Sequence, residues 1–255
     1  MSAEAGSAGS SMAARALSLL DAFDADHPRL TLSELALRAA LPLSTAHRLV
    51  AELVAWGGLE RRPDASYEVG RRIWRLGLLA PVSLGLRDLA LPYLQDLSAA
   101  TGENAHLAVR DGTSALYVER ISGRAAVPIV SRAGTRLPLH ATGVGKVLLA
   151  HASDDVVAQT LAVARRATPY TVVTPGGLRR QLADVRRRGY ALTAEEMTLG
   201  TRSVAVPVVD PQDRVFAAVG IVVASNRRDL TRLVPALLVA ARGMARAHAP
   251  DAGRM

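Results

Sequence analysis

The sequence contains no cysteine among its 255 residues, which excludes disulfide bonds, thiolate metal sites and a cysteine nucleophile. It also lacks an apolar run near the roughly 20 residues that a transmembrane helix requires. The first eleven residues, MSAEAGSAGSS, lack the basic start and the apolar middle of a signal peptide. We therefore expect a disordered tail over residues 1–11 and a cytoplasmic protein.

Signatures of catalysis and of metal binding are missing as well. The six histidines follow no HExxH spacing, and no GxSxG is present. We expect His106, His140 and His151 to be core or surface residues, and the neighbours Glu195 and Glu196 to lie in a solvated loop or at a helix start. Because nothing in the sequence assembles a nucleophile, a base and an orienting group, we expect no enzymatic activity, no metal and no cofactor.

A glycine-rich segment, LPLHATGVGK, leads into an expected helix over residues 143–151. It differs from a phosphate-binding P-loop, because His140 stands where that loop needs a glycine and Val147 stands where it needs a serine or threonine. The backbone N–H groups of such a loop could hold a small anion such as a carboxylate. A tight packing turn explains the same residues equally well.

The net charge of +8 is unevenly distributed along the chain. Residues 1–80 hold nine arginines and nine acidic residues, whereas residues 81–255 hold 22 basic and 14 acidic residues and carry the whole excess. Net charge therefore gives no argument for nucleic-acid binding by the N-terminal part. Within residues 38–75, however, seven arginines face four acids, and local clusters of this kind make phosphate contacts.

Two short helical patterns, separated by a proline, lie between Thr31 and Trp56. Thr31 and Glu34 fit a capping box at the start of the first pattern. The pattern breaks at Pro42, because the residue before a proline is pushed out of the helical region. Apolar residues then resume at helical spacing, at Ala46, Leu49, Val50, Leu53 and Val54. These features indicate a helix-turn-helix, although an ordinary two-helix hairpin has the same pattern.

The second helix places polar residues on the face opposite its apolar stripe. Small hydroxyls and an arginine lie at its N-terminal end, where a helix favours phosphate and where an arginine can reach guanine edges in a major groove. We therefore expect contacts to DNA from Ser44, Thr45, His47 and Arg48, together with Thr31 at the start of the preceding helix.

A turn-forming cluster, PDAS, separates two short strand patterns over residues 59–62 and 67–69, which predicts a β-hairpin. Directly after a recognition helix, such a hairpin is the wing of a winged helix. Arg61 and Arg62 are then placed to contact phosphate or the minor groove. The alternative is a solvent-facing hairpin whose arginines have no such role.

The remaining sequence alternates helical and strand-like patterns, which predicts helices beside a largely antiparallel sheet. Helices are expected over residues 13–23, 71–80, 84–100, 143–151, 177–188 and 230–247. Strands are expected over residues 105–110, 115–121, 127–131, 203–209 and 215–224. Pro81 ends or kinks the helix over 71–80, and we expect the domain boundary there.

Three segments, in this order, resemble the IclR family of bacterial transcriptional regulators: TLSELALRAALPLSTAHRLVAELVAWGGLER, GTRLPLHATGVGKVLLA and RRRGYALTAEEMTLGTRSVAVPVVDPQDRVFAAVGIVV. The resemblance extends from about Met12 to Ala247. It implies an α+β protein with a winged helix-turn-helix over residues 12–70, a linker helix over 71–82 and a GAF/PAS-like effector-binding domain over 83–250. It also implies a homodimer or tetramer that binds double-stranded, palindromic operator DNA, as a repressor or an activator.

The resemblance further implies an effector pocket, whose residues carry over to Ala126, Ile129, Gly143, Val144, Thr193, Thr201, Ser203, Gly220 and Val222. Members of the glyoxylate and pyruvate type have an aspartate where Thr193 stands, and serines where Gly220 and Val222 stand. The pocket expected from this sequence is less polar. Our hypothesis is therefore a small organic acid with an apolar body, such as an aromatic carboxylate.

The expected function is thus a ligand-responsive transcriptional regulator whose operator affinity changes when a small organic acid binds. The residues alone leave two alternatives open. An enzyme acting on a small acid through residues 81–255 would need a base and a nucleophile in the pocket. A protein-interaction module, in which the helix-turn-helix only dimerises, would show no salt-dependent affinity for DNA.

Overall fold

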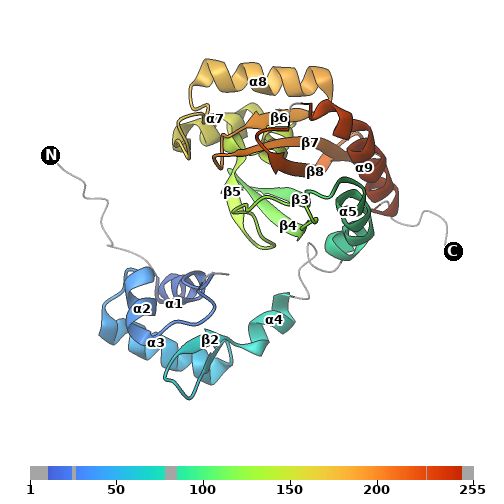
Figure 1. The fold of residues 1–255 in the computed structure, drawn as a ribbon. Helices are drawn as coiled ribbons and strands as arrows, with labels where there is room; N and C mark the ends of the chain where they lie inside the picture. Colours follow the sequence, from blue (N-terminus) through green and yellow to red (C-terminus); the bar gives the residue numbers. More distant parts are fainter. Residues whose placement is uncertain (1–10, 25–26, 78–84, 228, 249–255) are drawn as a thin grey trace. The chain divides into compact units, whose positions relative to one another are not determined.

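The computed structural model describes residues 11–24, 27–77, 85–227 and 229–248 (Figure 1). The chain divides into two compact units, Met1–Ala80 and Pro81–Met255, each with its own hydrophobic core. Among the described residues, no helix is both long and apolar enough to span a bilayer.

In its described residues, the N-terminal unit has three helices, a two-stranded hairpin and a further short helix. Their bounds are α1 (Met12–Asp21), α2 (Leu32–Arg38), α3 (Leu43–Trp56), β1 (Leu59–Arg61), β2 (Tyr67–Val69) and α4 (Arg71–Gly77). Buried apolar side chains from the three helices and the hairpin form one core, which includes Leu19, Leu35, Leu49, Leu59 and Tyr67. This is the arrangement of a winged helix-turn-helix.

Local sequence explains where these elements begin and end. The Thr31 side chain caps α2 by accepting a hydrogen bond from Glu34 N, and the Glu34 carboxylate accepts one from Thr31 N at 2.7 Å. Helix α3 ends at Gly57, whose φ of 82° lies in the left-handed region that favours glycine. A Cβ at Gly70 would lie 2.3 Å from the Gly57 carbonyl oxygen, so glycine allows the hairpin to close against the end of α3.

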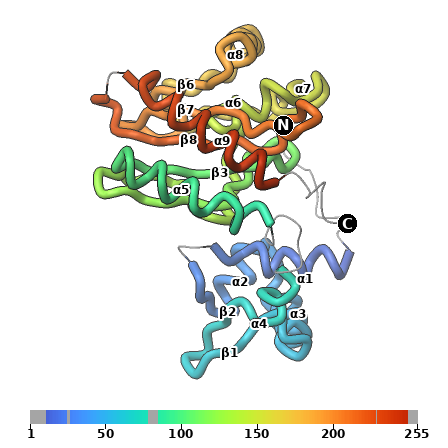
Figure 2. The backbone as a smooth tube through the Cα atoms, turned by 90° about the vertical axis from the view of Figure 1, so that its right-hand side faces the viewer, coloured from blue at the N-terminus to red at the C-terminus, as the bar shows by residue number. Residues whose placement is uncertain are grey.

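The C-terminal unit is built on a six-stranded antiparallel sheet in the order β5-β4-β3-β8-β7-β6. The strands are β3 (Asn104–Asp111), β4 (Ser114–Ile121), β5 (Arg136–Pro138), β6 (Ala191–Ala194), β7 (Thr201–Val209) and β8 (Val215–Ala224). The helices are α5 (Arg87–Thr101), α6 (Gly143–Ala150), α7 (Asp154–Val163), α8 (Pro175–Arg188) and α9 (Val234–His248), with 3₁₀ turns η2 (Leu139–Ala141) and η3 (Thr231–Leu233). Figure 2 follows the backbone through this unit.

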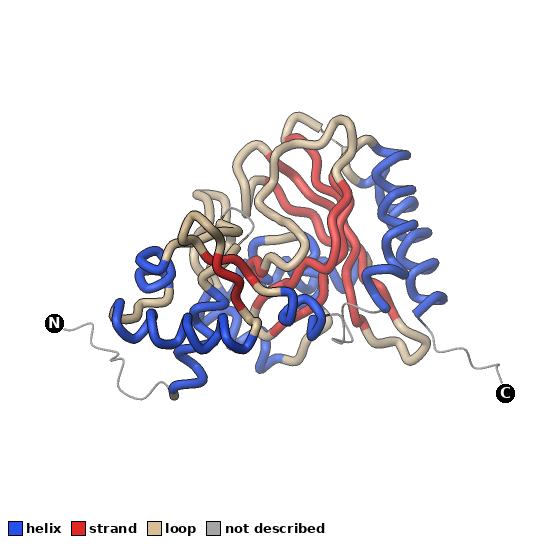
Figure 3. Tube along the Cα trace, turned by 90° about the horizontal axis from the view of Figure 1, so that it is seen from below, coloured by secondary structure: helices blue, strands red, loops and turns tan. Residues whose placement is uncertain are grey.

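Helices cover both faces of this sheet, as Figure 3 shows. Helices α5 and α9 pack together on one face, and α6 lies against the other with α8 packed on it. Successive strand residues point to opposite faces. Val204, Val206 and Val208 of β7 therefore join the core under α5 and α9, whereas Ala205 joins the core beside α6. The same alternation turns His106 and Ser203 toward α6.

Most expected helices and strands are present, and three differences stand out. Residues 127–131, expected as a strand, are irregular, because Pro128 has no N–H for a ladder and the edge strand beside β4 is instead β5. Helix α7 and strands β5 and β6 lie where the sequence pattern predicted no element. The expected helix over 71–80 is described up to Gly77, and the rest of it, like the remainder of the expected linker, lies outside the described residues.

Candidate functional sites

The outer face of α3 carries most of the residues expected to contact DNA. The apolar stripe of this helix is buried, at Ala46, Leu49, Val50 and Leu53. Ser44, His47 and Arg48 are exposed, and Thr45 is half-buried between the two faces. Arg48 also contacts a neighbour on its own helix, since its Nη1 lies 3.3 Å from Glu52 Oε1. Such an exposed pair is weak and exchanges readily for a phosphate or a base edge.

Thr31 is exposed, but its polar groups are used in the cap of α2. Its hydroxyl donates to Glu34 Oε2 at 2.8 Å while accepting from Glu34 N. These hydrogen bonds lower the pKa of Glu34, with the bond from the Thr31 backbone as the largest cause. The first role of Thr31 is therefore to set the start of α2.

Both wing arginines are exposed, Arg61 at the end of β1 and Arg62 in the turn that follows. Arg62 Nη1 lies 3.4 Å from Glu68 Oε1, and Arg29 Nε lies 3.5 Å from the other oxygen of the same carboxylate. Glu68 thus neutralises part of the positive charge of the hairpin, that of Arg62 included, whereas Arg61 is exposed on β1.

A small cavity lies in the C-terminal unit, between the sheet and the first turn of α6. It encloses about 40 Å³, which is room for very few water molecules. Six of the nine expected pocket residues line it: Ile129, Gly143, Thr193, Thr201, Ser203 and Val222. Ten further residues complete the lining: His106, Tyr117, Val130, Ser131, Leu137, Ala141, Thr142, Glu196, Met197 and Thr198.

The other three expected residues, Ala126, Val144 and Gly220, are not part of this lining. Val144 is fully buried, and its Cγ1 lies 3.1 Å from where a Cβ on Gly220 would stand. Val144 and Gly220 therefore pack against each other where α6 meets β8. Gly220 leaves space for the imidazole of His106, whose Nε2 lies 3.0 Å from the same Cβ position.

Hydroxyl groups and a helix N-terminus meet at one end of the cavity. Thr193 and Ser203 face each other across β6 and β7, with their hydroxyl oxygens 2.6 Å apart. Thr142 caps α6, since its Oγ1 accepts from Gly145 N at 3.1 Å and donates to Pro138 O at 3.2 Å. A Cβ at Gly143 would lie 2.5 Å from Ser203 Oγ, so glycine lets the first turn of α6 approach β7 closely.

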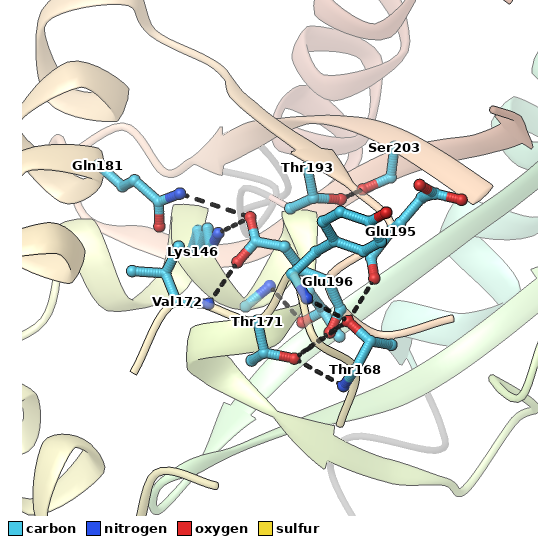
Figure 4. A network of polar contacts seen from close by, with 12 residues as sticks. Lys146, Thr168, Thr171, Val172, Gln181, Thr193, Glu195, Glu196 and Ser203 are labelled. Carbon is cyan, nitrogen blue, oxygen red and sulfur yellow. Dashed lines mark hydrogen bonds and ion pairs between the residues drawn. The ribbon is translucent and has the colours of Figure 1, made fainter. Parts of the chain in front are cut away.

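A buried ion pair includes one residue of the cavity lining, Glu196 (Figure 4). Lys146 of α6 is 1% exposed and its Nζ donates to Glu196 Oε1. Glu196 also accepts from Val172 N at 3.3 Å and Gln181 Nε2 at 3.4 Å. Its backbone carbonyl accepts from Thr171 Oγ1 at 2.7 Å. Burial lowers the pKa of Lys146, and the Glu196 carboxylate opposes this shift.

The expectation that Glu196 lies in a solvated segment is therefore wrong. Glu196 is buried, while Glu195 is half-buried and its Oε1 accepts a hydrogen bond from Gly200 N at 2.7 Å. The reason is the partner: Lys146 lies 50 residues away in sequence, and its buried ammonium group requires a carboxylate beside it. The pair fixes the start of the loop that supplies Glu196, Met197 and Thr198 to the cavity.

One of the most buried polar residues in the cavity lining is His106, on β3. Its Nδ1 is buried and has no hydrogen-bond partner among the described residues. The ring contacts Tyr117 edge-on, with centroids 5.1 Å apart. Burial, and then the nearby Arg120, lower the pKa of His106 to about 4, so the imidazole is neutral near pH 7. Burial also raises the pKa of Tyr117, which a hydrogen bond with Thr142 partly offsets.

Sequence reasoning missed His106 and Tyr117 as cavity residues. The signal available was the strand alternation that puts His106 on the same face of β3 as Ala108, and Tyr117 on the same face of β4 as Ala115. Within the described part of the chain, no group of three His, Asp or Glu side chains is arranged to hold a metal ion.

Comparisons with known proteins agree on one family over nearly the whole chain. The model described as IclR helix-turn-helix domain matches residues 12–63, and the one described as Bacterial transcriptional regulator IclR C-terminal matches residues 80–248. The HTH-type transcriptional regulator XynR of Escherichia coli is 35% identical over 84% of this chain and 86% of its own length. The glycerol operon regulatory protein of Streptomyces coelicolor is 36% identical over 94% of this chain and 95% of its own length.

Among solved structures, an IclR homolog from Microbacterium hydrocarbonoxydans, crystallised in complex with 4-hydroxybenzoate, is similar to this chain. The TM-score is 0.86 and the sequences are 36% identical, with 93% of this chain and 98% of the other covered.

Proposed function

The chain belongs to the IclR family of bacterial transcriptional regulators and is a ligand-responsive, DNA-binding regulator. We propose that residues 12–70 bind the operator, that residues 71–82 link them to an effector-binding domain over 83–250, and that DNA binding is this protein's function rather than catalysis. It then acts in the cytoplasm, where its operator is accessible.

Helix α3 enters the major groove of the operator with Ser44, Thr45, His47 and Arg48 toward the bases and flanking phosphates. The exposure of this face, opposite a buried apolar stripe, supports the assignment. Arg61 and Arg62 contact phosphate or the minor groove from the wing, and Thr31 positions α2 against the backbone. Because phosphate contacts release counterions, operator affinity falls steeply as salt concentration rises.

The regulator binds a palindromic operator as a homodimer, or as a tetramer made of two dimers. A palindrome suits a two-fold dimer, because each protomer then reads one half-site. Large apolar side chains stand exposed on α1 and α4, and Leu17, Trp74 and Leu76 are the most exposed of them. Their burial in a dimer would remove apolar surface from water.

The effector is a small organic acid with an apolar, aromatic body. The observation that carries this proposal is the cavity at the first turn of α6, where backbone N–H groups and the Thr142, Thr193 and Ser203 hydroxyls can receive a carboxylate. The similarity to the homolog crystallised with 4-hydroxybenzoate supports the same class. An acid of that size requires the cavity to open, and the irregular residues Ile129–Ser131 and Met197–Thr198 form the wall that can give way.

A gel-shift experiment tests this function directly. The full chain is titrated onto DNA from upstream of its own gene at two salt concentrations, with and without a panel of organic acids. A specific, salt-sensitive shift that one acid weakens or strengthens is expected. If no upstream fragment shifts at low salt, either the operator lies elsewhere or the helix-turn-helix serves dimerisation alone, and the proposal of an operator upstream of its own gene fails.

A further inference from the structure

A buried imidazole without a hydrogen-bond partner is unusual, because most buried polar groups in folded proteins are satisfied. His106 is 3% exposed, lines the cavity, and has an unpartnered Nδ1 among the described residues. Three neighbouring hydroxyl groups, unlike this nitrogen, already have a partner: Thr193 bonds Ser203, and Thr142 bonds both Gly145 and Pro138. The unpartnered nitrogen of His106 therefore indicates that its hydrogen-bond partner is a group of the bound ligand.

The electrostatic surroundings define which group this is. Tyr117 and Arg120 both lie on β4. Tyr117 contacts the ring of His106 and is neutral, and Arg120 stands directly opposite His106 in the pairing of β3 with β4. On the other side, β8 presents Gly220 and α6 presents Val144, neither of them charged. Glu196 is the one carboxylate in the cavity lining, and Lys146 already pairs with it.

A neutral imidazole carries one N–H donor and one acceptor nitrogen. A hydroxyl group can donate or accept, so it satisfies the free nitrogen in either tautomer. A hydrogen atom or a methyl group in the same place leaves the nitrogen buried and unpaired, which disfavours binding. The carboxylate of the same ligand binds more favourably to the backbone N–H groups at the start of α6, which donate hydrogen bonds to an anion.

We propose that His106 is a specificity-determining residue that recognises a hydroxyl group on the effector, so that the effector is a hydroxy acid rather than a simple carboxylic acid. The inference rests on the proposed function, because it takes the cavity as the site of an organic acid. It assigns the hydroxyl to His106 and the carboxylate to the first turn of α6.

The test is calorimetric titration of the full chain at pH 7 with benzoate, 4-methylbenzoate, 3-hydroxybenzoate and 4-hydroxybenzoate. A methyl group is close in size to a hydroxyl group, so the methyl compound isolates the hydrogen bond. The wild type is expected to bind one hydroxybenzoate at least about tenfold tighter than 4-methylbenzoate. In His106→Phe this preference is expected to vanish or to reverse.

Two further variants separate recognition from folding. His151→Phe makes the same change at an exposed histidine outside the cavity lining, and it should keep the wild-type preference. His106→Gln keeps a neutral donor and acceptor, and it should retain part of the preference. Melting temperatures of all variants establish that each is folded.

The outcomes distinguish the two proposals. If the wild type binds none of the four acids, the aromatic-acid effector and the role of His106 both fail. If it binds them with equal affinity, or if His106→Phe still prefers the hydroxyl compound, only the role of His106 fails. Titrations in buffers of different ionisation enthalpy add a further check. Uptake of a proton with the acid would show that a charged imidazolium holds the carboxylate, which also overturns the assignment.

Discussion

Arg87 and Glu119 form an ion pair, with Arg87 Nη2 lying 2.6 Å from Glu119 Oε2. Arg87 is the first residue of α5, which follows the segment between the two units. Glu119 is on β4, two residues beyond the cavity-lining Tyr117, and it is largely buried. Its other oxygen accepts a hydrogen bond from Arg120 N at 2.8 Å. The pair therefore ties a wall of the cavity to the start of the helix nearest the DNA-binding unit in sequence.

We predict that Arg87→Ala weakens the communication between effector and operator. Removing the tie should reduce the coupling free energy by about 0.5–2 kcal/mol, while the affinity for the effector alone changes little. Fluorescence anisotropy of labelled operator DNA, with and without saturating effector, measures the coupling. Arg136→Ala removes another ion pair of the same sheet, to Asp111, and serves as the control. An unchanged effector response in Arg87→Ala would contradict the prediction.

Among mutations near the cavity, those that break the Lys146–Glu196 ion pair should lower the unfolding free energy most. Lys146→Met leaves the Glu196 carboxylate buried without its cation, which costs about 3–5 kcal/mol of unfolding free energy. The double variant Lys146→Met/Glu196→Leu should recover part of this loss, because it removes both charges. Urea denaturation gives the values. Arg136→Ala, at an exposed ion pair, should cost less than about 1 kcal/mol of unfolding free energy. If Lys146→Met and Arg136→Ala lose the same unfolding free energy, this account is ruled out.

Stability should fall in acid partly because His106 must be protonated. Burial lowers the pKa of His106 to about 4 from 6.5. Between these values the unfolded chain binds more protons than the folded chain, so the unfolding free energy decreases as the pH falls from about 6.5 to 4. The decrease from this residue amounts to about 3 kcal/mol. His106→Phe should lose correspondingly less stability over that range, whereas His151→Phe should follow the wild type. If the unfolding free energy depends on pH in the same way in all three proteins, His106 does not make this contribution.

Arg48 should contribute to the sequence preference of the regulator. Arg48→Ala removes a side chain from the outer face of α3, so operator binding should weaken by about 1–3 kcal/mol and single-base changes should matter less. Competition with operator variants measures both effects. Arg242→Ala changes an exposed arginine on α9 and should leave the preference intact. A footprint and a preference unchanged in Arg48→Ala would remove this residue from the recognition surface.

Features that depend on neighbours in sequence were predictable. The capping box of Thr31 and Glu34, the apolar stripe of α3 and the continuous β-rich runs of β7 and β8 all follow from the local sequence. The short strands β5 and β6 carry too few residues for a pattern to emerge. The helix α7 has a weak amphipathic pattern, since it buries only Val157 and Thr160.

The cavity was only partly predictable, for a different reason. Resemblance to the family brought together Gly143, Thr193 and Ser203, which do line one cavity, because these positions lie on elements whose order is shared. His106, Tyr117 and Glu196 enter the lining through pairings between strands and through an ion pair that no local pattern reveals. The register of β3 against β4 and β8 decides which side chains meet, and register is a property of the folded sheet.

Lys146 is the single lysine of the sequence, and the fold encloses it almost completely. The folded protein consequently offers no accessible lysine amine to acetylating enzymes or to amine-reactive reagents. A succinimidyl dye at neutral pH should therefore leave Lys146 of the folded protein unmodified. Conversely, labelling of Lys146 would report directly on opening of the helix α6 environment, which makes this residue a chemical sensor of local unfolding.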